Sequence, residues 1–492
     1  MANGVYFKDL QSYVSELQKR GEVSTIKGAN WDLEIGILTE MAVEVKGHPA
    51  LLFEAIKDYP KECRLLTNAM TTIRRTAIAL GLPEDVHPLE MLKIWKDKRA
   101  GFQPVAPVIV ENALVKQNII RESDVDIYKL PVPFWHEHDG GRYIGTGDAG
   151  IMREPDGDWV NVGTYRMMIH DKNTTALYMS PGRHGQLILQ KAKERHQSLP
   201  VAVSLGHDPV LAVTAAMPIQ PRVSEYEVAG WLLGKPYEVT PGVVTGLPVP
   251  ANAEIVIEGE ILPPEIETRM EGPFGEWTGY YGGGPTPQPV VKVKSILYRD
   301  NPILWGMPAV KPFRVQLAAL PFTAAETWDA LEKAGVPEVR GVWQAGGIWY
   351  PSFTIIAIKQ RYGGHAKQAG LVASGAKGTA YLGRFVIVVD DDIDITNLED
   401  VVWAISTRCD PASGIDLLRN CLSSPLDPLL PPQVRLEAPH GTQVNSRVII
   451  DACKPFQWYD KFPMTNIASP ELRKKVRQKF ESFFQELTKE RR

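Results

Sequence analysis

The spacing of apolar positions divides the chain into three stretches. In the first, Phe7, Leu10, Val14 and Leu17 recur at helical intervals and the run stops at Gly21, which predicts an amphipathic helix followed by a glycine cap. Further on, the proline-rich text QPVAPVIV and KLPVPFWHEHDGG breaks regular structure and is typical of a crossing between domains. We therefore expect a first, mixed α/β segment over residues 1–120.

The middle stretch, residues 121–305, has the alternation of short strands separated by turn residues. The strand-like runs predict a mostly antiparallel β-domain: 160–170, 176–180, 209–217, 253–262 and 289–298. One helix interrupts this domain, because Ser224 and Glu227 form a capping box that places Glu225 in the first helical turn.

The last stretch, residues 306–492, alternates strand with helix, which predicts an α/β layer. Its runs are 303–307, 353–359 and 384–389 for strands, and 323–335, 365–374 and 397–406 for helices. Capping boxes at Thr323/Glu326 and Thr396/Glu399 predict two helix starts. A terminal helix after Ser469 has one apolar stripe: Leu472, Val476, Phe480, Phe483, Phe484 and Leu487. The expected fold class is α+β multidomain, with an α/β C-terminal oligomerisation domain.

Composition narrows the class of protein. Of the 492 residues, 44% are hydrophobic and 23% charged, and the net charge of −4 offers no basic excess for binding nucleic acid. The four cysteines are scattered, which fits a reducing cytoplasm rather than a disulfide framework. No apolar run approaches the roughly 20 residues that a membrane span needs. We expect a cytoplasmic protein without a membrane span or a nucleic-acid partner.

Two motifs suggest a dinucleotide site and a metal site, but in each case the neighbouring residues disfavour that interpretation. Gly145 to Gly150 match GxGxxG, yet Pro155 and Asp156-Gly157 follow too soon for the helix that a dinucleotide fold needs. A nicotinamide oxidoreductase is therefore the weaker alternative. The cluster from His136 to Asp139 has metal-type side chains, but its place beside prolines favours a polar seam between domains over a metal site.

Candidate chemistry concentrates in the β-domain. Asn161 and Arg166 lie in one strand run, His184 in a turn, and Glu225 at a helix start, and each alone has an ordinary structural reading as a paired polar group. Together the amide, imidazole and carboxylate form a mixed oxygen and nitrogen set suited to Mn2+ or Mg2+.

Two further carboxylates, Glu271 and Glu276, lie in a loop of glycine, proline and aromatic residues. Apolar surroundings raise the pKa of a carboxyl group until it holds a proton near neutral pH. An acid of this kind beside an arginine is a candidate proton donor. Taken alone, the loop also reads as a surface hairpin with solvated acids.

These segments, EGPFGEWTGY above all, resemble the UbiD family of prenylated-FMN decarboxylases, in order and over most of the chain. The resemblance implies a split-barrel-like flavin domain and reversible, non-oxidative decarboxylation of an aromatic, heteroaromatic or α,β-unsaturated carboxylic acid through a covalent prenylated-FMN adduct. It also implies a flavin prenyltransferase as the supplier of the cofactor. A homodimer, or an assembly of dimers, would be held partly by the terminal helix.

Site roles follow from the same resemblance. The Glu-Arg-Glu catalytic network falls on Glu271, Arg166 and Glu276, with Glu276 as the proton donor. K+ would bind near the backbone of 215–217 and Arg408. The ligands of Mn2+ (or Mg2+) would be Asn161, His184 and Glu225. The cofactor contacts would be Thr146, Asn161, Gly163, Thr164, Tyr165, Arg166, Arg183, His184, Met217, Pro218, Glu225 and Lys377.

Alternatives stay open for substrate, activity and local geometry. Trp277 would narrow the pocket toward a flat ring, while Lys311 and Arg314 either meet a polar substituent or are surface cations. A non-catalytic flavin-binding scaffold and a physiological carboxylase are the rival functions. Because Asn161 and Arg166 have opposite parity in one strand, we expect a bulge near Gly163.

Overall fold

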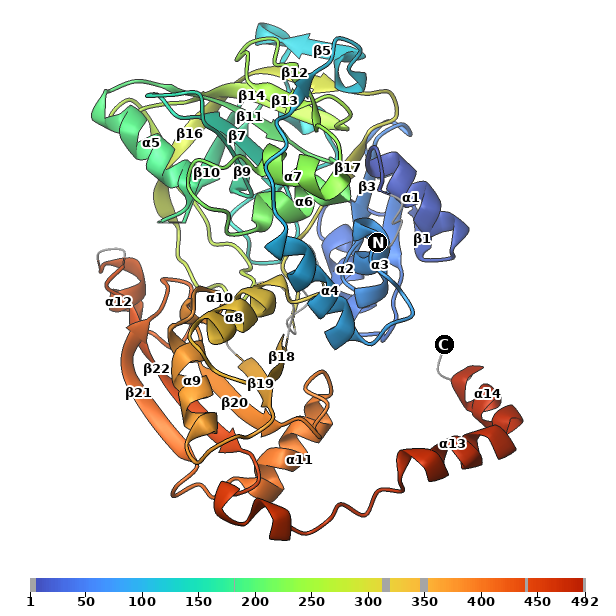
Figure 1. Ribbon diagram of the computed structural model, residues 1–492. Coiled ribbons are helices and arrows are strands. Elements are labelled where there is room, and N and C mark those ends of the chain that lie inside the picture. Colours follow the sequence, from blue (N-terminus) through green and yellow to red (C-terminus); the bar gives the residue numbers. More distant parts are fainter. Residues whose placement is uncertain (1–5, 181, 312–318, 346–352, 439–440, 490–492) are drawn as a thin grey trace.

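The computed structural model describes residues 6–180, 182–311, 319–345, 353–438 and 441–489 (Figure 1). It contains a curled β-domain with a small N-terminal sheet beside it and a separate α/β domain below (Figure 1). This mixed, multidomain α+β architecture confirms the predicted fold class. The boundaries at 120 and 305 stay a prediction.

The N-terminal part is a four-stranded sheet with helices against it. The predicted first helix is α1 (Leu10–Lys19), and Gly21 follows it at φ 71°. The sheet has the order β1 (Val23–Lys27), β2 (Ala50–Glu54), β3 (Arg64–Thr67) and β17 (Ile303–Trp305). The run at 303–307 was expected in the C-terminal layer, which is wrong, because β17 instead pairs in parallel with β3. The helices are α2 (Glu34–Val43), α3 (Ile73–Leu80) and α4 (Pro88–Ala100).

The middle domain is a ten-stranded antiparallel sheet. Its main path is β6 (Tyr143–Gly145), β9 (Arg166–Asp171), β10 (Thr174–Tyr178), β16 (Thr286–Tyr298), β14 (Ile255–Ile261), β11 (Leu199–Ser204), β7 (Ala149–Arg153) and β8 (Val160–Gly163). Off this path, β5 (Asn118–Arg121) and β15 (Thr268–Glu271) both pair with β16. A three-stranded sheet lies beside it: β13 (Pro248–Pro250), β12 (Glu238–Pro241) and β4 (Val108–Ile109).

The connections show that this sheet curls. Strands β8 and β9 stand near opposite ends of the path, yet only Thr164 and Tyr165 join them. Three Cα steps span at most about 11 Å, so the two ends of the sheet must approach each other. The result is a split half-barrel whose seam runs between β6 and β8.

The seam also corrects the expected bulge at Gly163. β8 ends at Gly163 and β9 begins at Arg166, so Asn161 and Arg166 lie on different strands with different neighbours. The parity conflict disappears because the chain leaves one strand before entering the next.

Three helices accompany the half-barrel: α5 (His184–Glu194), α6 (Pro209–Ala216) and α7 (Glu225–Leu233). The capping box of Ser224 and Glu227 at the start of α7 is confirmed. The strand expected at 209–217 is wrong. Asp208 Oδ1 accepts from the N–H groups of Val210 and Leu211, and Pro209 stands at the first helical position, so this apolar run forms a buried helix.

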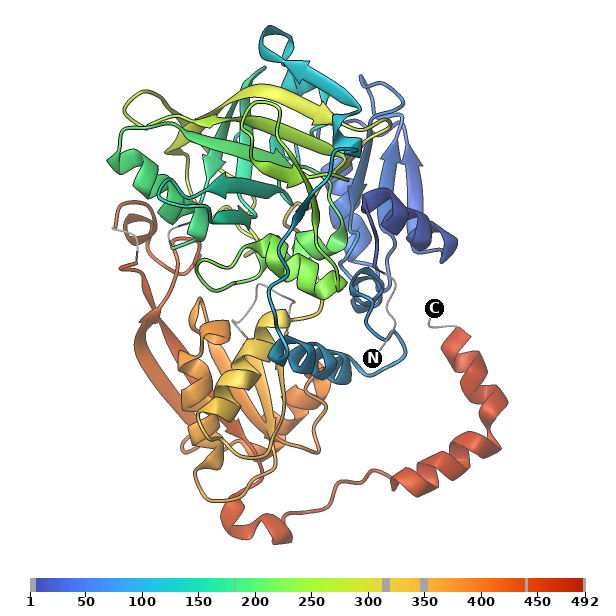
Figure 2. The same cartoon turned by 45° about the horizontal axis from the view of Figure 1, so that its top comes forward.

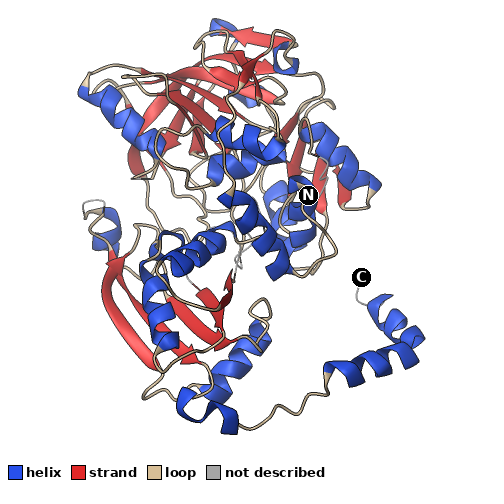
Figure 3. Ribbon diagram, viewed as in Figure 1, coloured by secondary structure: helices blue, strands red, loops and turns tan. Residues whose placement is uncertain are grey.

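The C-terminal domain is a five-stranded sheet with helices packed on it (Figure 3). The order is β18 (Val339–Gln344), β19 (Phe353–Ile358), β20 (Phe385–Asp390), β22 (Val444–Ala452) and β21 (Ile415–Leu422). The helices are α8 (Phe322–Lys333), α9 (His365–Gly375), α10 (Lys377–Ala380), α11 (Leu398–Arg408) and α12 (Pro432–Leu436). Both predicted capping boxes are wrong here, because α8 follows Pro321 without a side-chain cap and α11 is capped by Asn397.

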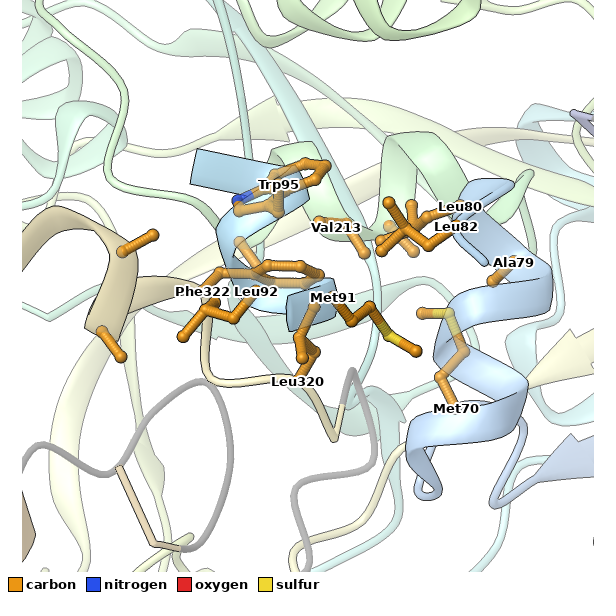
Figure 4. Close-up of a cluster of buried hydrophobic side chains, with 14 of the residues drawn as sticks. Met70, Ala79, Leu80, Leu82, Met91, Leu92, Trp95, Val213, Leu320 and Phe322 are labelled. Carbon is orange, nitrogen blue, oxygen red and sulfur yellow. The ribbon is translucent and has the colours of Figure 1, made fainter. Parts of the chain in front are cut away.

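One buried cluster joins the three parts of the chain (Figure 4). Ala79 on α3 and Trp95 on α4 come from the N-terminal part, Val213 on α6 from the half-barrel region, and Phe322 on α8 from the C-terminal domain. The rings of Trp95 and Phe322 are 4.5 Å apart. Apolar packing therefore anchors α8, and with it the C-terminal domain, against the other two parts.

The chain ends in two helices that stand apart from the rest (Figures 1 and 2). The predicted single terminal helix is wrong, because α13 (Pro470–Lys479) and α14 (Glu481–Lys489) meet at Phe480 with non-helical angles. Its stripe is solvated, with Leu472, Val476, Phe480 and Phe483 each 48–55% exposed. The side chain of Leu487 lies outside the described residues. Among the described helices, none is long and apolar enough to cross a membrane.

Candidate active site

Arg166 and two glutamates form a buried ion-pair cluster inside the half-barrel. Arg166 begins β9, Glu271 ends β15, and Glu276 lies in the loop that follows. Glu271 accepts from Arg166 Nη2 at 2.8 Å and its other oxygen lies 2.7 Å from Nε, while Glu276 pairs with Nη1. The two carboxylates are 1% and 6% exposed. The predicted Glu-Arg-Glu set is therefore brought together in space.

Aromatic side chains surround this cluster. The guanidinium lies over the rings of Tyr178 at 4.3 Å and Phe274 at 5.0 Å, and the hydroxyl of Tyr143 donates to Glu271 at 2.8 Å. Burial raises the pKa of Glu276, and the charge of Glu271 adds to this, whereas Arg166 opposes it. Glu276 therefore holds a proton to higher pH than an ordinary glutamic acid.

A second polar cluster gathers on the other side of the seam. Asn161 Nδ2 donates to Glu225 Oε1 at 2.9 Å, and the N–H of Val162 donates to the other oxygen at 2.6 Å. The hydroxyl of Tyr165 donates to Asn161 Oδ1 at 2.8 Å and accepts from the N–H of Gly185 at 2.9 Å. The same bonds bring His184, the first residue of α5, next to this group.

In this second cluster, burial is the largest influence on the pKa values of Glu225 and His184. It raises the pKa of Glu225 to about 8, and the N–H and amide donors only partly offset it. Burial also lowers the pKa of His184, and the charges of Lys377 and Arg183 lower it further. The amide of Asn161 and the carboxyl group of Glu225 are thus in direct contact, while the ring of His184, at the start of α5, packs edge-on against Trp159 at 5.1 Å.

Comparisons with known proteins assign the chain and its fold to one family. Models of the three parts of 3-octaprenyl-4-hydroxybenzoate carboxy-lyase match the chain: the N-terminal domain at residues 14–94, the Rift-related domain at 108–312 and the C-terminal domain at 317–452. The chain belongs to the UbiD family. It is therefore an enzyme of the carboxy-lyase class.

Relatives and solved structures agree with this placement. A phenolic acid decarboxylase of Streptomyces sp. (strain D7) is 33% identical over 468 residues, covering 91% of this chain and 92% of its own. A pyrrole-2-carboxylic acid decarboxylase of Pseudomonas aeruginosa is 32% identical over 475 residues, covering 92% of each. The UbiD-class enzyme HmfF of Pelotomaculum thermopropionicum, solved with FMN, is 29% identical with a TM-score of 0.82 over 95% of this chain and 98% of its own. Its evolved dimeric form, solved with prFMN, is 28% identical with a TM-score of 0.79 over the same shares.

The remaining predicted cofactor residues of this UbiD-family chain lie along the seam. Thr146 Oγ1 accepts from the N–H of Met307 at 2.9 Å, and the N–H of Thr164 donates to the carbonyl of Ala215 at 3.3 Å. Gly163 has no room for a side chain, because a Cβ there would collide with the ring of Tyr165.

The C-terminal domain also reaches the site. Lys377 Nζ on α10 donates to the carbonyl of Pro218 at 3.5 Å, and Arg183 stands at the N-terminus of α5 beside His184. Pro218 directly follows Met217, the residue that ends α6. The predicted contacts therefore come from two domains.

Other predicted residues lie elsewhere. Arg408 is held by Asp390 and Asp392 inside the C-terminal domain. Lys311 is exposed and lies against Gly279, and Arg314 lies outside the described residues. In the described part of the chain, no group of three or more His, Cys, Asp or Glu side chains is disposed to hold a metal.

Two buried residues of the site were missed from the sequence. Tyr143 bonds to Glu271, and Asp148 Oδ1 accepts from the N–H of Tyr165 at 3.1 Å, with burial raising the pKa of Asp148 to about 8. Asp148 lies in the GTGDAG stretch, where strand β7 begins at Ala149, so the helix that a dinucleotide fold needs does not follow. No feature of the local sequence distinguishes Tyr143 from a core tyrosine.

Proposed function

We propose that this UbiD-family enzyme removes CO2 from an aromatic, heteroaromatic or α,β-unsaturated carboxylic acid, using prenylated FMN, with Glu276 as the proton donor. The observation that best supports this proposal is the buried cluster in which Arg166 contacts both Glu271 and Glu276. A scaffold that only bound flavin would gain nothing from two buried carboxylates around one guanidinium, an arrangement that costs desolvation energy.

The residues present fit the cofactor and a divalent metal. Asn161, His184 and Glu225 offer oxygen and nitrogen donors in one place, the set that Mn2+ or Mg2+ accepts. The N-terminus of α5, Arg183 and Lys377 add positive charge where a flavin phosphate would bind. When bound, prenylated FMN would supply the electron sink that direct loss of CO2 from an unsaturated carbon lacks. We propose in addition that K+ binds near the backbone of residues 215–217.

The chain's own groups then carry the proton and the orientation. Arg166 donates from Nη2 to Glu271 and pairs through Nη1 with Glu276, and its guanidinium would orient the substrate's carboxylate. Glu276 holds a proton because burial raises its pKa, and it would return that proton to the carbon that lost CO2. Glu271, fixed by Tyr143, keeps Arg166 in place. Phe274 and Tyr178 exclude water from the cluster.

The substrate class rests on the relatives. Those with named activities act on phenolic acids and on pyrrole-2-carboxylic acid, both of which have flat rings. We propose an acid of the same shape here.

The test is Glu276→Gln in enzyme produced together with a flavin prenyltransferase. The substitution removes the proton and keeps the volume, so we expect decarboxylation of ring acids to fall by about 10²-fold or more while the flavin absorbance is retained. Wild-type turnover by the variant would exclude the role. Enzyme from a host lacking any prenyltransferase should be inactive, and full activity there would require another cofactor.

We also propose that α13 and α14 pack against a second copy of the chain, in a homodimer or an assembly of dimers. Among the described side chains, Leu472, Val476, Phe480 and Phe483 of the stripe are 48–55% exposed, and burying each is worth about 1.5–3 kcal/mol. Replacing Val476 and Phe483 by serine should lower the native mass, whereas Lys474→Ser, off the stripe, should not. An unchanged mass in the double variant would contradict the proposal.

A further inference from the structure

The segment His136 to Asp139 has no role in the metal site or the ion-pair cluster, yet it touches the loop that bears Glu276. Asp139 Oδ1 accepts from the N–H of Gly275 at 2.8 Å, and Gly275 is the residue before Glu276. The next residue, Gly140, donates its N–H to the carbonyl of Pro273 at 2.7 Å. Residues 272–281, here called the catalytic loop, are thus bonded at two successive points.

His136 fixes the carboxylate that makes the first of these bonds. Its Nδ1 lies 3.0 Å from Asp139 Oδ2 and its Nε2 lies 2.8 Å from the carbonyl oxygen of Ala309. A carbonyl can only accept, and Asp139 already accepts from the N–H groups of Gly275 and His136. Both ring nitrogens therefore act as donors, and His136 is an imidazolium paired with a buried carboxylate.

Steric fit and charge support this arrangement. A Cβ at Gly275 would lie 2.8 Å from His136 Nδ1, so only glycine lets the loop approach the ring this closely. Burial disfavours the charge on His136, but the bond and attraction of Asp139 outweigh it and raise the pKa of His136. Ala309 lies between β17 and the C-terminal domain, so the ring also contacts the segment that joins the domains.

We propose that Asp139 and His136 are positioning residues, which clamp the catalytic loop so that Glu276 stays against Arg166. The expected fall in kcat rests on the proposed function, whereas the fixing of the loop by Asp139 and His136 does not. Residues 276–280 close on themselves, because the N–H of Glu276 donates to the carbonyl of Tyr280 and that of Gly279 to the carbonyl of Glu276, so bonds at 273–275 from outside the turn help to set its position. A displacement of about 1 Å at a reacting group can cost on the order of 10²-fold in rate.

The experiment compares three variants of the prenylated-FMN-loaded enzyme. Asp139→Ala removes the acceptor for the Gly275 N–H, whereas Asp139→Asn keeps one oxygen for it. His138→Gln is the matched control, since His138 is exposed and its hydrogen bond to the loop comes from the backbone N–H, its ring making only a contact at 5.7 Å with that of Tyr281. We measure kcat, KM, flavin absorbance and amide hydrogen exchange of a peptide covering residues 272–281.

We expect kcat of Asp139→Ala to fall roughly 10- to 100-fold with KM and flavin content unchanged, and exchange in the loop to rise. Asp139→Asn should recover most of both, and His138→Gln should match the wild type. Wild-type kcat and exchange in Asp139→Ala would overturn the proposal, as would an equal loss of kcat, flavin and melting temperature. If Asp139→Ala does not fold, His136→Gln tests the proposal by the same measurements, because it removes the Nδ1 donor to Asp139. Should Glu276→Gln prove fully active, the proposed function fails, while loop exchange still decides the clamp.

Discussion

The two buried carboxylate clusters on either side of the seam balance their charge in different ways. Around Arg166, two glutamates share one guanidinium, and a proton on Glu276 makes the cluster neutral. Around Glu225, the donors are the neutral amide of Asn161 and the N–H of Val162. Within the described residues Glu225 has no ion-pair partner, and the charge of Arg183 is the weakest influence on its pKa.

This difference separates a cluster that the polypeptide completes from one that it leaves incomplete. A buried carboxylate without a counter-ion costs several kcal/mol, and the pKa of Glu225, raised to about 8, reflects that cost. The first cluster carries its own cation. In the second, the proposed metal ion would supply the positive charge that the described side chains do not.

The largest effect should come from breaking the first cluster with Arg166→Met. Two buried carboxylates then lose their only guanidinium, and we expect the free energy of unfolding at pH 7 to fall by about 3–5 kcal/mol, measured by urea unfolding. Without Arg166, which opposes the effect of burial, the folded-state pKa of Glu276 rises further, so the stability present below the unfolded pKa is lost as pH increases. The loss should therefore shrink on acidification.

Arg142→Met is the control for this prediction. Arg142 is held by the carbonyl of Val132, the hydroxyl of Tyr59 and the ring of Trp31 rather than by a carboxylate. The free energy of unfolding of Arg142→Met should fall by less than that of Arg166→Met, and the difference from the wild type should not change on acidification. Equal losses in the two variants would mean that charge balance does not distinguish the Arg166 cluster.

The next effect should come from adding Mn2+ to metal-free protein. At about 100 times its dissociation constant the ion should stabilise the wild type by about 2.7 kcal/mol, read from thermal unfolding. Glu225→Gln should abolish this gain. Glu227→Gln changes the same charge on the same helix, but Glu227 caps Ser224 instead of facing Asn161, so it should keep the gain. A Mn2+ response that survives Glu225→Gln would contradict the assignment of the second cluster.

The charged residues of both clusters could be predicted from the sequence, but Tyr143 and the geometry of the clusters could not. Arg166, Glu271 and Glu276 stand out because charged residues are rare among such apolar and aromatic neighbours. Their contact depends on β9 and β15 lying in one sheet, which local spacing does not encode. The same limit explains β17, since a three-residue apolar run carries no information on which sheet it joins.

Other errors have local causes. The run at 209–217 is apolar throughout, and such a run fits a buried strand or a buried helix equally well. The deciding signal was Asp208-Pro209, a cap and a first-turn proline. The bulge expected at Gly163 assumed one strand, whereas a change of strand across two residues solves the same parity conflict.

The smallest effect should come from Tyr165→Phe, which loosens the second cluster without removing a proposed ligand. The hydroxyl of Tyr165 joins Asn161 Oδ1 to the N–H of Gly185, and so holds β8 and the start of α5 in register. Without it, we expect Mn2+ affinity to fall about tenfold, or about 1.4 kcal/mol, as for other residues that orient metal ligands. Tyr226→Phe removes an equally buried hydroxyl that donates to the carbonyl of Pro248, so it should lower stability but not Mn2+ affinity. If both variants bound Mn2+ like the wild type, the bond between Tyr165 and Asn161 would serve folding alone.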